Sequence, residues 1–142
     1  RKYLIESFDA TLQKNKPGAL MAQQRARNAP RRFVLESRLL EVLLQLAVLH
    51  VSPTGYRTDE MRIDALLRFL RERYGIYIDQ LPPGEGFGTP TIDDRQALRA
   101  NLQAFTARLR EIGFYRDLSD AYVTQTVVPR YRINPKAAEA GA

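Results

Sequence analysis

The sequence contains no cysteine, and His50 is the single histidine among its 142 residues. Without cysteine, disulfide bonds, thiolate catalysis and cysteine-ligated zinc are excluded within this segment. A lone histidine at the end of an apolar helix argues against a histidine metal site or a Ser-His-Asp triad, because it is more often a packing or helix C-terminal residue. A metal-dependent nuclease would also need a lysine, and all four lysines lie outside the expected core. They are Lys2, Lys14, Lys16 and Lys136.

Long apolar runs are also missing. The longest candidate, Leu39–Val51, is interrupted by Glu41 and Gln45, and it falls short of the ~18–20 residues of a membrane span. No basic-then-apolar secretory signal precedes it. The sequence begins at Arg1, and we take it as a fragment of a longer protein. With 44% hydrophobic and 27% charged residues, we expect a soluble, cytoplasmic domain that makes no membrane contact.

No constellation of residues predicts catalysis. The glycine-rich stretch Gly84–Gly88 lacks the Lys-Ser/Thr and the tight strand-loop-helix frame of a phosphate-binding loop. The seven tyrosines have no neighbouring histidine to support a tyrosine nucleophile. The acidic pairs fall at helix starts and turns, where carboxylates have structural roles; they are Asp59/Glu60, Asp93/Asp94 and Asp117/Asp120. We therefore predict a protein that is not an enzyme and that carries no cofactor or metal.

Basic charge is concentrated near the N-terminus. The net charge is +6, and no acidic residue occurs between Ala10 and Leu35. Such a segment is a flexible basic arm or a linker that orders on a partner, and its part Ala19–Arg27 is compatible with a helix. Arginine suits phosphate because its planar fork donates two parallel hydrogen bonds. Six basic residues in this stretch equal the net charge of the chain: Lys14, Lys16, Arg25, Arg27, Arg31 and Arg32.

The clearest element is an amphipathic helix over Asp94–Ile112. Its apolar side chains recur in steps of four and three residues, which places them on one helix face. Gly113 then ends the helix, as a residue that adopts positive φ without strain should. The apolar positions are Leu98, Leu102, Phe105, Leu109 and Ile112. The positions expected on the opposite side are Arg99, Gln103, Thr106 and Arg110.

Other elements are expected on both sides of this helix. A short helix over Lys2–Gln13 precedes the basic arm, and the apolar run Phe33–Val51 predicts a central helix. A further helix, capped by Thr58 or Asp59, extends to Tyr74, and Thr91 or Asp93 caps the helix that follows. The remaining expectations are a strand at Ile76–Ile78, a loop at Leu81–Ile92, and a hairpin of Phe114–Leu118 and Tyr122–Ile133 joined by a Ser119-Asp120 turn.

This order of elements predicts a mainly α fold with a small β-hairpin, similar to a winged helix-turn-helix domain. We expect an N-terminal helix and basic arm over residues 1–32, a winged-helix-like domain over 33–133, and a disordered tail over 134–142. In a winged-helix domain the third helix enters the major groove of DNA, and the hairpin wing touches the backbone or the minor groove.

The candidate DNA contacts come from the third helix, the wing and the arm. Arginine suits the base edge of G, and glutamine suits that of A. Asn101 and Arg108 flank the candidate residues on the helix. Asp93 and Asp94 are an objection, because two carboxylates at the start of a recognition helix repel phosphates. The alternative is that they only cap the helix and that its arginines form a solvated face. The candidates are Arg25, Arg27, Arg31, Arg32, Arg95, Arg99, Gln103, Arg110, Arg116, Arg130 and Arg132.

The last strand of the predicted hairpin alternates basic and aromatic residues. Arg130 and Arg132 flank Tyr131, so both arginines are expected on one face of the strand, in a pattern that suits backbone contact. Pro129 implies an edge strand or a bulge. An edge strand kept soluble by its charge is an equally good explanation.

Two segments carry a resemblance to a wider group of proteins. Arg62–Ile78 followed by Gly113–Arg132 resembles the C-terminal helical and winged-helix regions of large bacterial phage-defence and mobile-DNA system proteins. The resemblance covers about half the chain, and it implies a non-catalytic part of a multi-component machine, with any enzymatic domains lying upstream.

We therefore predict a double-stranded-DNA-binding domain of a larger bacterial protein. The alternative is a protein–protein assembly module with the same fold, which contacts other subunits or upstream domains. In that case Phe33–Val51 or Leu4–Leu12 would bury part of its surface on the partner.

Overall fold

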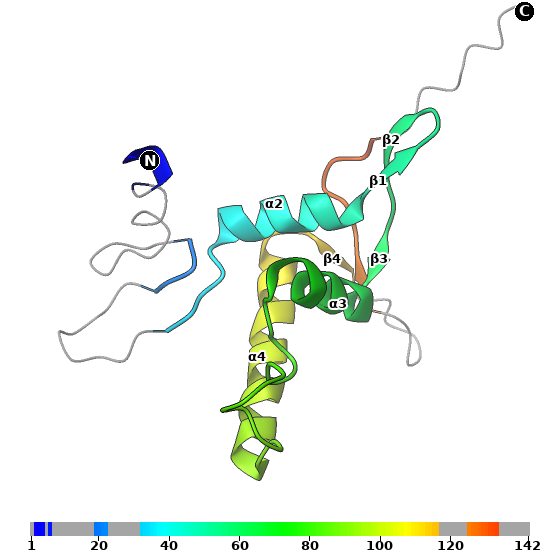
Figure 1. The fold of residues 1–142 in the computed structure, drawn as a ribbon. Helices are drawn as coiled ribbons and strands as arrows, with labels where there is room; N and C mark the ends of the chain where they lie inside the picture. The colour runs from blue at the N-terminus through cyan, green and yellow to red at the C-terminus, as the bar shows by residue number, and fades with distance from the viewer. Residues whose placement is uncertain (1, 5, 7–18, 23–31, 117–124, 134–142) are drawn as a thin grey trace, which may run out of the picture. The chain divides into compact units, whose positions relative to one another are not determined.

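A computed structural model describes residues 2–4, 6, 19–22, 32–116 and 125–133 of the chain (Figure 1). The chain divides into two compact units, Arg1–Leu43 and Leu44–Ala142, and the division falls within helix α2. In chain order the elements are α2 (Ser37–Val48), β1 (Leu49–Ser52), β2 (Gly55–Thr58), β3 (Met61–Arg62), α3 (Ile63–Tyr74), α4 (Ile92–Glu111), β4 (Tyr115–Arg116) and β5 (Thr126–Val127). The fold is mixed α/β with two small antiparallel sheets, rather than mainly α with one hairpin.

In the first unit, residues 19–22 run antiparallel to residues 32–34. Met21 and Phe33 form an isolated bridge, and the Ala22 N–H donates to the Arg32 carbonyl at 3.0 Å. The helix expected over Ala19–Arg27 is therefore wrong for its described positions. Residues 2–4 are helical, as expected, while most of the helix predicted over Lys2–Gln13 lies outside the described residues.

The predicted helix Phe33–Val51 is too long at both ends. Phe33 belongs to the bridge just described, so α2 begins at Ser37. At the other end, β1 and β2 form a hairpin in which Leu49 pairs with Thr58 and Ser52 with Gly55. Gly55 has φ +125°, a conformation that glycine adopts without strain. The chain therefore turns at Pro53-Thr54 and pairs with itself instead of ending a helix there.

Helix α3 starts later than the sequence predicts. Arg62 is its N-cap and belongs to β3, so the predicted caps Thr58 and Asp59 are wrong. At its other end Gly75 is left-handed, with φ +66°, and its N–H donates to the Arg71 carbonyl. This is the expected glycine stop. The strand predicted at Ile76–Ile78 is wrong, because these residues follow the helix without pairing to any strand.

The helix predicted over Asp94–Ile112 is confirmed as α4, and a three-stranded antiparallel sheet follows it. Gly113, with φ +77°, turns the chain from α4 into β4. The strand order is β3-β5-β4, so Val127 on β5 pairs with Met61 on one side and with Tyr115 on the other. The hairpin expected after α4 is thus present as β4 and β5, although the Ser119-Asp120 turn and the tail 134–142 lie outside the described residues.

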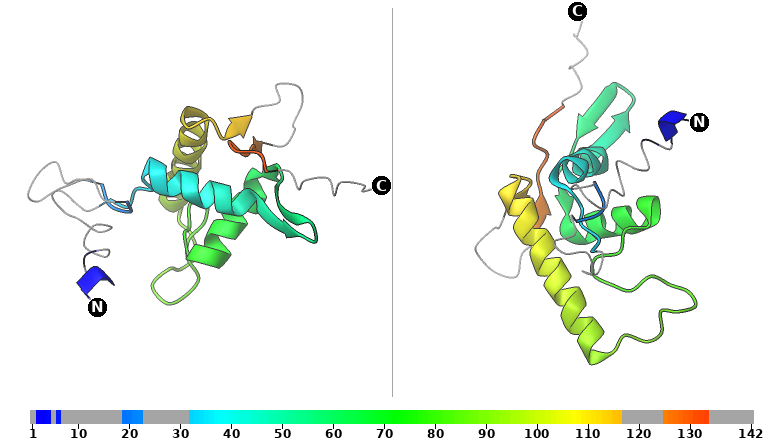
Figure 2. Two further views of the ribbon diagram at one scale, coloured as in Figure 1. Left: turned by 90° about the horizontal axis from the view of Figure 1, so that it is seen from above. Right: turned by 90° about the vertical axis from the view of Figure 1, so that its left-hand side faces the viewer.

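The core of the second unit forms around the C-terminal half of α4. Leu98 and Leu102 on the predicted apolar stripe are half-buried, whereas Phe105 and Leu109 are buried. The N-terminal half of α4 extends away from α3 and the sheet (Figure 2, right). The apolar side chains that form its buried core are Leu44, Ala47, Val48, Leu66, Leu67, Leu70, Phe105, Leu109, Phe114 and Val127.

Candidate nucleic-acid interface

The N-terminus of α4 is fixed by a capping box of Thr91 and Asp94. The Thr91 hydroxyl accepts from the Asp94 N–H at 3.2 Å, while the Asp94 carboxylate accepts from the Thr91 hydroxyl at 2.7 Å and from the Thr91 N–H at 2.8 Å. These hydrogen bonds lower the pKa of Asp94 below its ordinary value of 3.8, because they favour the charged form. Of the two predicted caps, Thr91 is confirmed. Asp93 is exposed in the first turn.

The polar residues predicted to contact DNA from α4 are exposed. At 3.6 residues per turn, Arg95 and Arg99 border the buried stripe, while Gln103 lies closer to the far side. Neither Arg95 nor Arg99 forms an ion pair with any residue that the structure describes. On the other edge, Arg108 pairs with Glu111 at 2.8 Å. The first half of α4 therefore offers two guanidinium groups to a ligand.

Thr106 does not lie on the exposed side of α4 as predicted. Thr106 is 8% exposed, and its hydroxyl donates to the carbonyl oxygens of Leu102 and Gln103 at 3.0 and 2.9 Å. A threonine inside a helix satisfies its hydroxyl in this way when water is excluded. The exposed residues Gln103 and Arg110 are therefore separated along the helix by a buried position.

The arginines near the three-stranded sheet have partners that the sequence does not reveal. Arg116 and Arg132 both approach the Glu60 carboxylate, at 4.0 and 3.8 Å. The Arg110 guanidinium lies 4.6 Å from the ring centroid of Tyr115, a cation–π distance. Glu60 thus places a negative charge among the basic residues predicted for the wing.

The last basic residues are not arranged as a strand. β5 ends at Val127, Arg130 and Tyr131 form a bend beyond it, and Arg132 belongs to no strand, so the prediction that Arg130 and Arg132 share one strand face is wrong. Pro129 is buried and has no N–H to donate to a sheet. Instead, the Ile133 carbonyl accepts from the Thr58 N–H at 2.9 Å. This hydrogen bond joins the segment after β5 to the end of β2. Arg130 lies 5.9 Å from the ring centroid of Tyr131.

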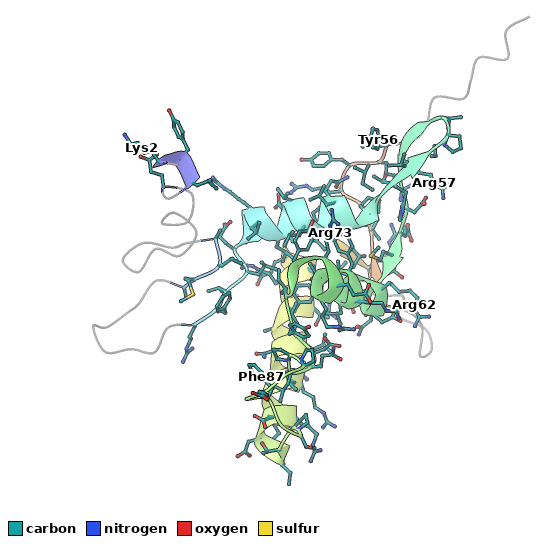
Figure 3. The ribbon with its side chains drawn as sticks, viewed as in Figure 1. Lys2, Tyr56, Arg57, Arg62, Arg73 and Phe87 are labelled. Carbon is teal, nitrogen blue, oxygen red and sulfur yellow. The ribbon has the colours of Figure 1, made fainter. Side chains whose placement is uncertain are left out.

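Most of the basic arm lies outside the described residues, including Arg25, Arg27 and Arg31. Arg32 is described and is exposed in the first unit. Two other exposed arginines, Arg57 and Arg62 (Figure 3), pair with Asp59 and Asp64, each at 3.0 Å. These ion pairs distinguish them from the arginines in the first half of α4.

One family model matches residues 1–131, that of the methylation-associated defense system protein MAD7. The chain belongs to the MAD7 family. No curated protein and no solved structure matches it. Membership of the MAD7 family confirms the expected association with a defence system, which the sequence suggested through Arg62–Ile78 and Gly113–Arg132.

Within the part of the chain that the structure describes, no group of three or more metal-ligating side chains occurs. No helix found there is long and apolar enough to cross a bilayer. Two features of this MAD7-family chain escaped the sequence reasoning: the β1–β2 hairpin and a cavity beside the loop that leads into α4. The alternation in Leu49–Ser52 and Gly55–Thr58 around Pro53-Thr54 is the signal that predicts such a hairpin.

Proposed function

We propose that this chain is a non-catalytic, double-stranded-DNA-binding component of a methylation-associated defence system, built on a winged-helix fold. The order α2, β3, α3, α4, β4, β5, with β5 between the other two strands, supports the proposal. A winged-helix domain has this order, and its third helix and hairpin contact DNA. The β1–β2 hairpin is then an insertion between the first helix and the first strand.

The observation that carries the DNA-binding proposal is the exposed pair Arg95 and Arg99 on α4, the third helix in this order. Both side chains are exposed, and no carboxylate pairs with either among residues 32–116 and 125–133. Arginines of this kind bind phosphates or the edge of guanine. The capping box answers part of the objection raised by the acidic start of α4, because Asp94 is directed to Thr91.

The test is fluorescence anisotropy of the chain with a labelled random duplex at low and at moderate salt. We expect salt-sensitive binding, which Arg95→Gln and Arg99→Gln each weaken several-fold, with the salt slope lowered by about one for each phosphate that the variant no longer binds. Arg62→Gln is the matched control, since it removes the same charge from an exposed arginine that is already paired with Asp64. The proposal fails if no duplex binds at low salt, or if Arg62→Gln weakens binding as much as Arg99→Gln does.

A role in protein assembly is the second candidate, and the β1–β2 hairpin favours it. Val51 and Tyr56 are paired across the strands and are 81% and 59% exposed, an apolar pair of the kind enriched at interfaces. Val51→Ser and Tyr56→Ser should release a partner subunit of the defence system while leaving duplex affinity unchanged. Co-purification from cells that express the whole system measures this.

A further inference from the structure

A cavity of about 640 Å³ lies between helix α3 and the loop that connects it to α4. It is largely open to solvent, so a ligand would lie against its lining rather than be enclosed by it. Polar groups from α3 and from the loop line it together with aromatic rings and prolines; the residues that matter most are Arg68, Glu72, Tyr77, Gln80, Pro83 and Phe87.

The loop that forms one wall of this cavity is held at both ends. At its start, the Arg71 guanidinium binds the Asp79 carboxylate at 2.8 Å, and these side chains are only 19% and 29% exposed. The Ile76 N–H donates to the Leu70 carbonyl at 3.1 Å. At its end, Thr91 caps α4. Each end of this wall is therefore held by hydrogen bonds at the helix that adjoins it.

The middle of the loop presents an aromatic ring at the edge of the cavity. Gly84 and Gly86 both have positive φ, and the Phe87 N–H donates to the Gly84 carbonyl at 3.3 Å. This turn leaves Phe87 (Figure 3) 51% exposed. Tyr77, at the other end of the loop, is half-buried and also lines the cavity. Two aromatic side chains are thus available to a flat ligand.

The lining chemistry fits a nucleobase. Aromatic side chains stack on unpaired bases, and the amide of Gln80 and the guanidinium of Arg68 can bond to the edges of a base or to its phosphate. Arg71 is already paired with Asp79, and Glu72 is the one carboxylate among the residues that line the cavity. The wall of the cavity continues directly into the N-cap of α4, the helix that carries Arg95 and Arg99.

We infer that this cavity binds an unpaired nucleobase of DNA that is held along α4. The inference rests on the proposed DNA binding, and it specifies which DNA is preferred: a duplex interrupted by an unpaired base rather than a continuous duplex. The base stacks on Phe87 and enters beside Tyr77, while the flanking duplex contacts Arg95 and Arg99.

The test compares three labelled DNAs by anisotropy with the full chain: a 20-base-pair duplex, the same duplex with one bulged thymidine, and the same duplex with a three-nucleotide gap. We expect the bulged and gapped DNAs to bind about tenfold more tightly than the duplex, which corresponds to the lower end of base–aromatic stacking effects. Phe87→Ala should abolish this preference and leave duplex affinity unchanged. Phe87→Tyr should retain it.

Tyr56→Ala is the matched control, since it removes an exposed aromatic ring from β2, far from Phe87 (Figure 3). It should leave the preference intact. Equal affinity for all three DNAs overturns the inference while leaving the proposed function standing, and so does a preference that survives Phe87→Ala. If none of the DNAs binds at low salt, both the proposed function and the inference are wrong.

Discussion

The two halves of α4 differ in what surrounds them. In the second half, Phe105 and Leu109 are buried in the core, and the chain leaves the helix at Gly113 and enters β4. In the first half, Leu98 is the most buried apolar side chain and is only partly buried, while Ile92 is 69% exposed. One continuous helix therefore combines a segment that stabilises the fold with a segment that tertiary packing barely supports.

This difference explains how a helix with a modest apolar stripe can carry arginines at its exposed end. Burial of apolar side chains supplies most of the stability of a helix in a protein, and in α4 that burial is concentrated at Phe105 and Leu109. Arg95 and Arg99 are thereby free of any packing role. Substitutions in the two halves should separate stability from binding.

The largest effect is expected for Leu109→Ala. Leu109 is fully buried, and removing most of its side chain leaves a cavity in the core, so the free energy of unfolding should fall by about 2–5 kcal/mol. Urea denaturation followed by circular dichroism measures the change. Leu98→Ala is the matched control in the first half and should cost clearly less than Leu109→Ala, because Leu98 is only partly buried. Equal losses for the two variants would contradict the comparison.

A smaller effect is expected for Thr91→Ala at the start of α4. Loss of the side-chain cap should lower the free energy of unfolding by about 1 kcal/mol. Because the first half of the helix has little tertiary support, this loss should fray residues 92–99 before the whole domain unfolds. Amide hydrogen exchange measures fraying directly. Unchanged protection in the first turns of α4 would contradict this expectation.

The same capping box predicts a dependence on pH. The pKa of Asp94 is lowered below 3.8, first by the Thr91 hydroxyl and then by the Thr91 N–H. A lowered pKa in the folded state means that the stabilisation is complete above pH 3.8 and is lost as the pH falls through the folded value. Thr91→Ala removes the first of these causes, so the pKa of Asp94 should rise towards 3.8. An NMR titration of the Asp94 carboxyl group measures it, and an unshifted titration would show that the hydroxyl is not the cause.

The smallest effect is expected for Glu60→Gln. The arginines near the sheet have the Glu60 carboxylate as a partner, and those in the first half of α4 do not. Arg116 and Arg132 share this carboxylate, whereas Arg95 and Arg99 have none within the described ranges. Glu60→Gln removes the competing charge, and duplex affinity should rise about two- to fivefold, in line with the weak energies of exposed ion pairs. Anisotropy titrations measure the rise. A fall in affinity would mean that Glu60 positions the two arginines instead of competing for them.

The sequence predicts the helices of this domain better than its strands. The spacing of Leu98, Phe105 and Leu109 is sufficient to locate α4, and Gly75 and Gly113 mark where α3 and α4 end. Strand β3 has two residues, Met61 and Arg62, too few to show an alternating pattern. Its pairing with β5 depends on a segment far along the chain, and local propensity cannot reveal such a pairing.

The candidate site was predictable in residue type but not in arrangement. Arg95 and Arg99 are exposed as expected, since they depend only on the period of α4. The proximity of Glu60 to Arg116 and Arg132 is a tertiary contact, so no pattern within either segment indicates it. The spacing of Thr106 along α4 places it at the edge of the apolar stripe, and its burial follows from the packing of neighbouring elements.

The capping box at the N-terminus of α4 and the burial of its C-terminal half together determine how far the helix extends from the core. At a rise of about 1.5 Å per residue, its first ten residues span roughly 15 Å. The major groove of B-DNA is about 8.5 Å deep. Under the proposed DNA binding, the first half of α4 is therefore long enough to reach the floor of the groove, and the capping box of Thr91 and Asp94 keeps its leading turn wound.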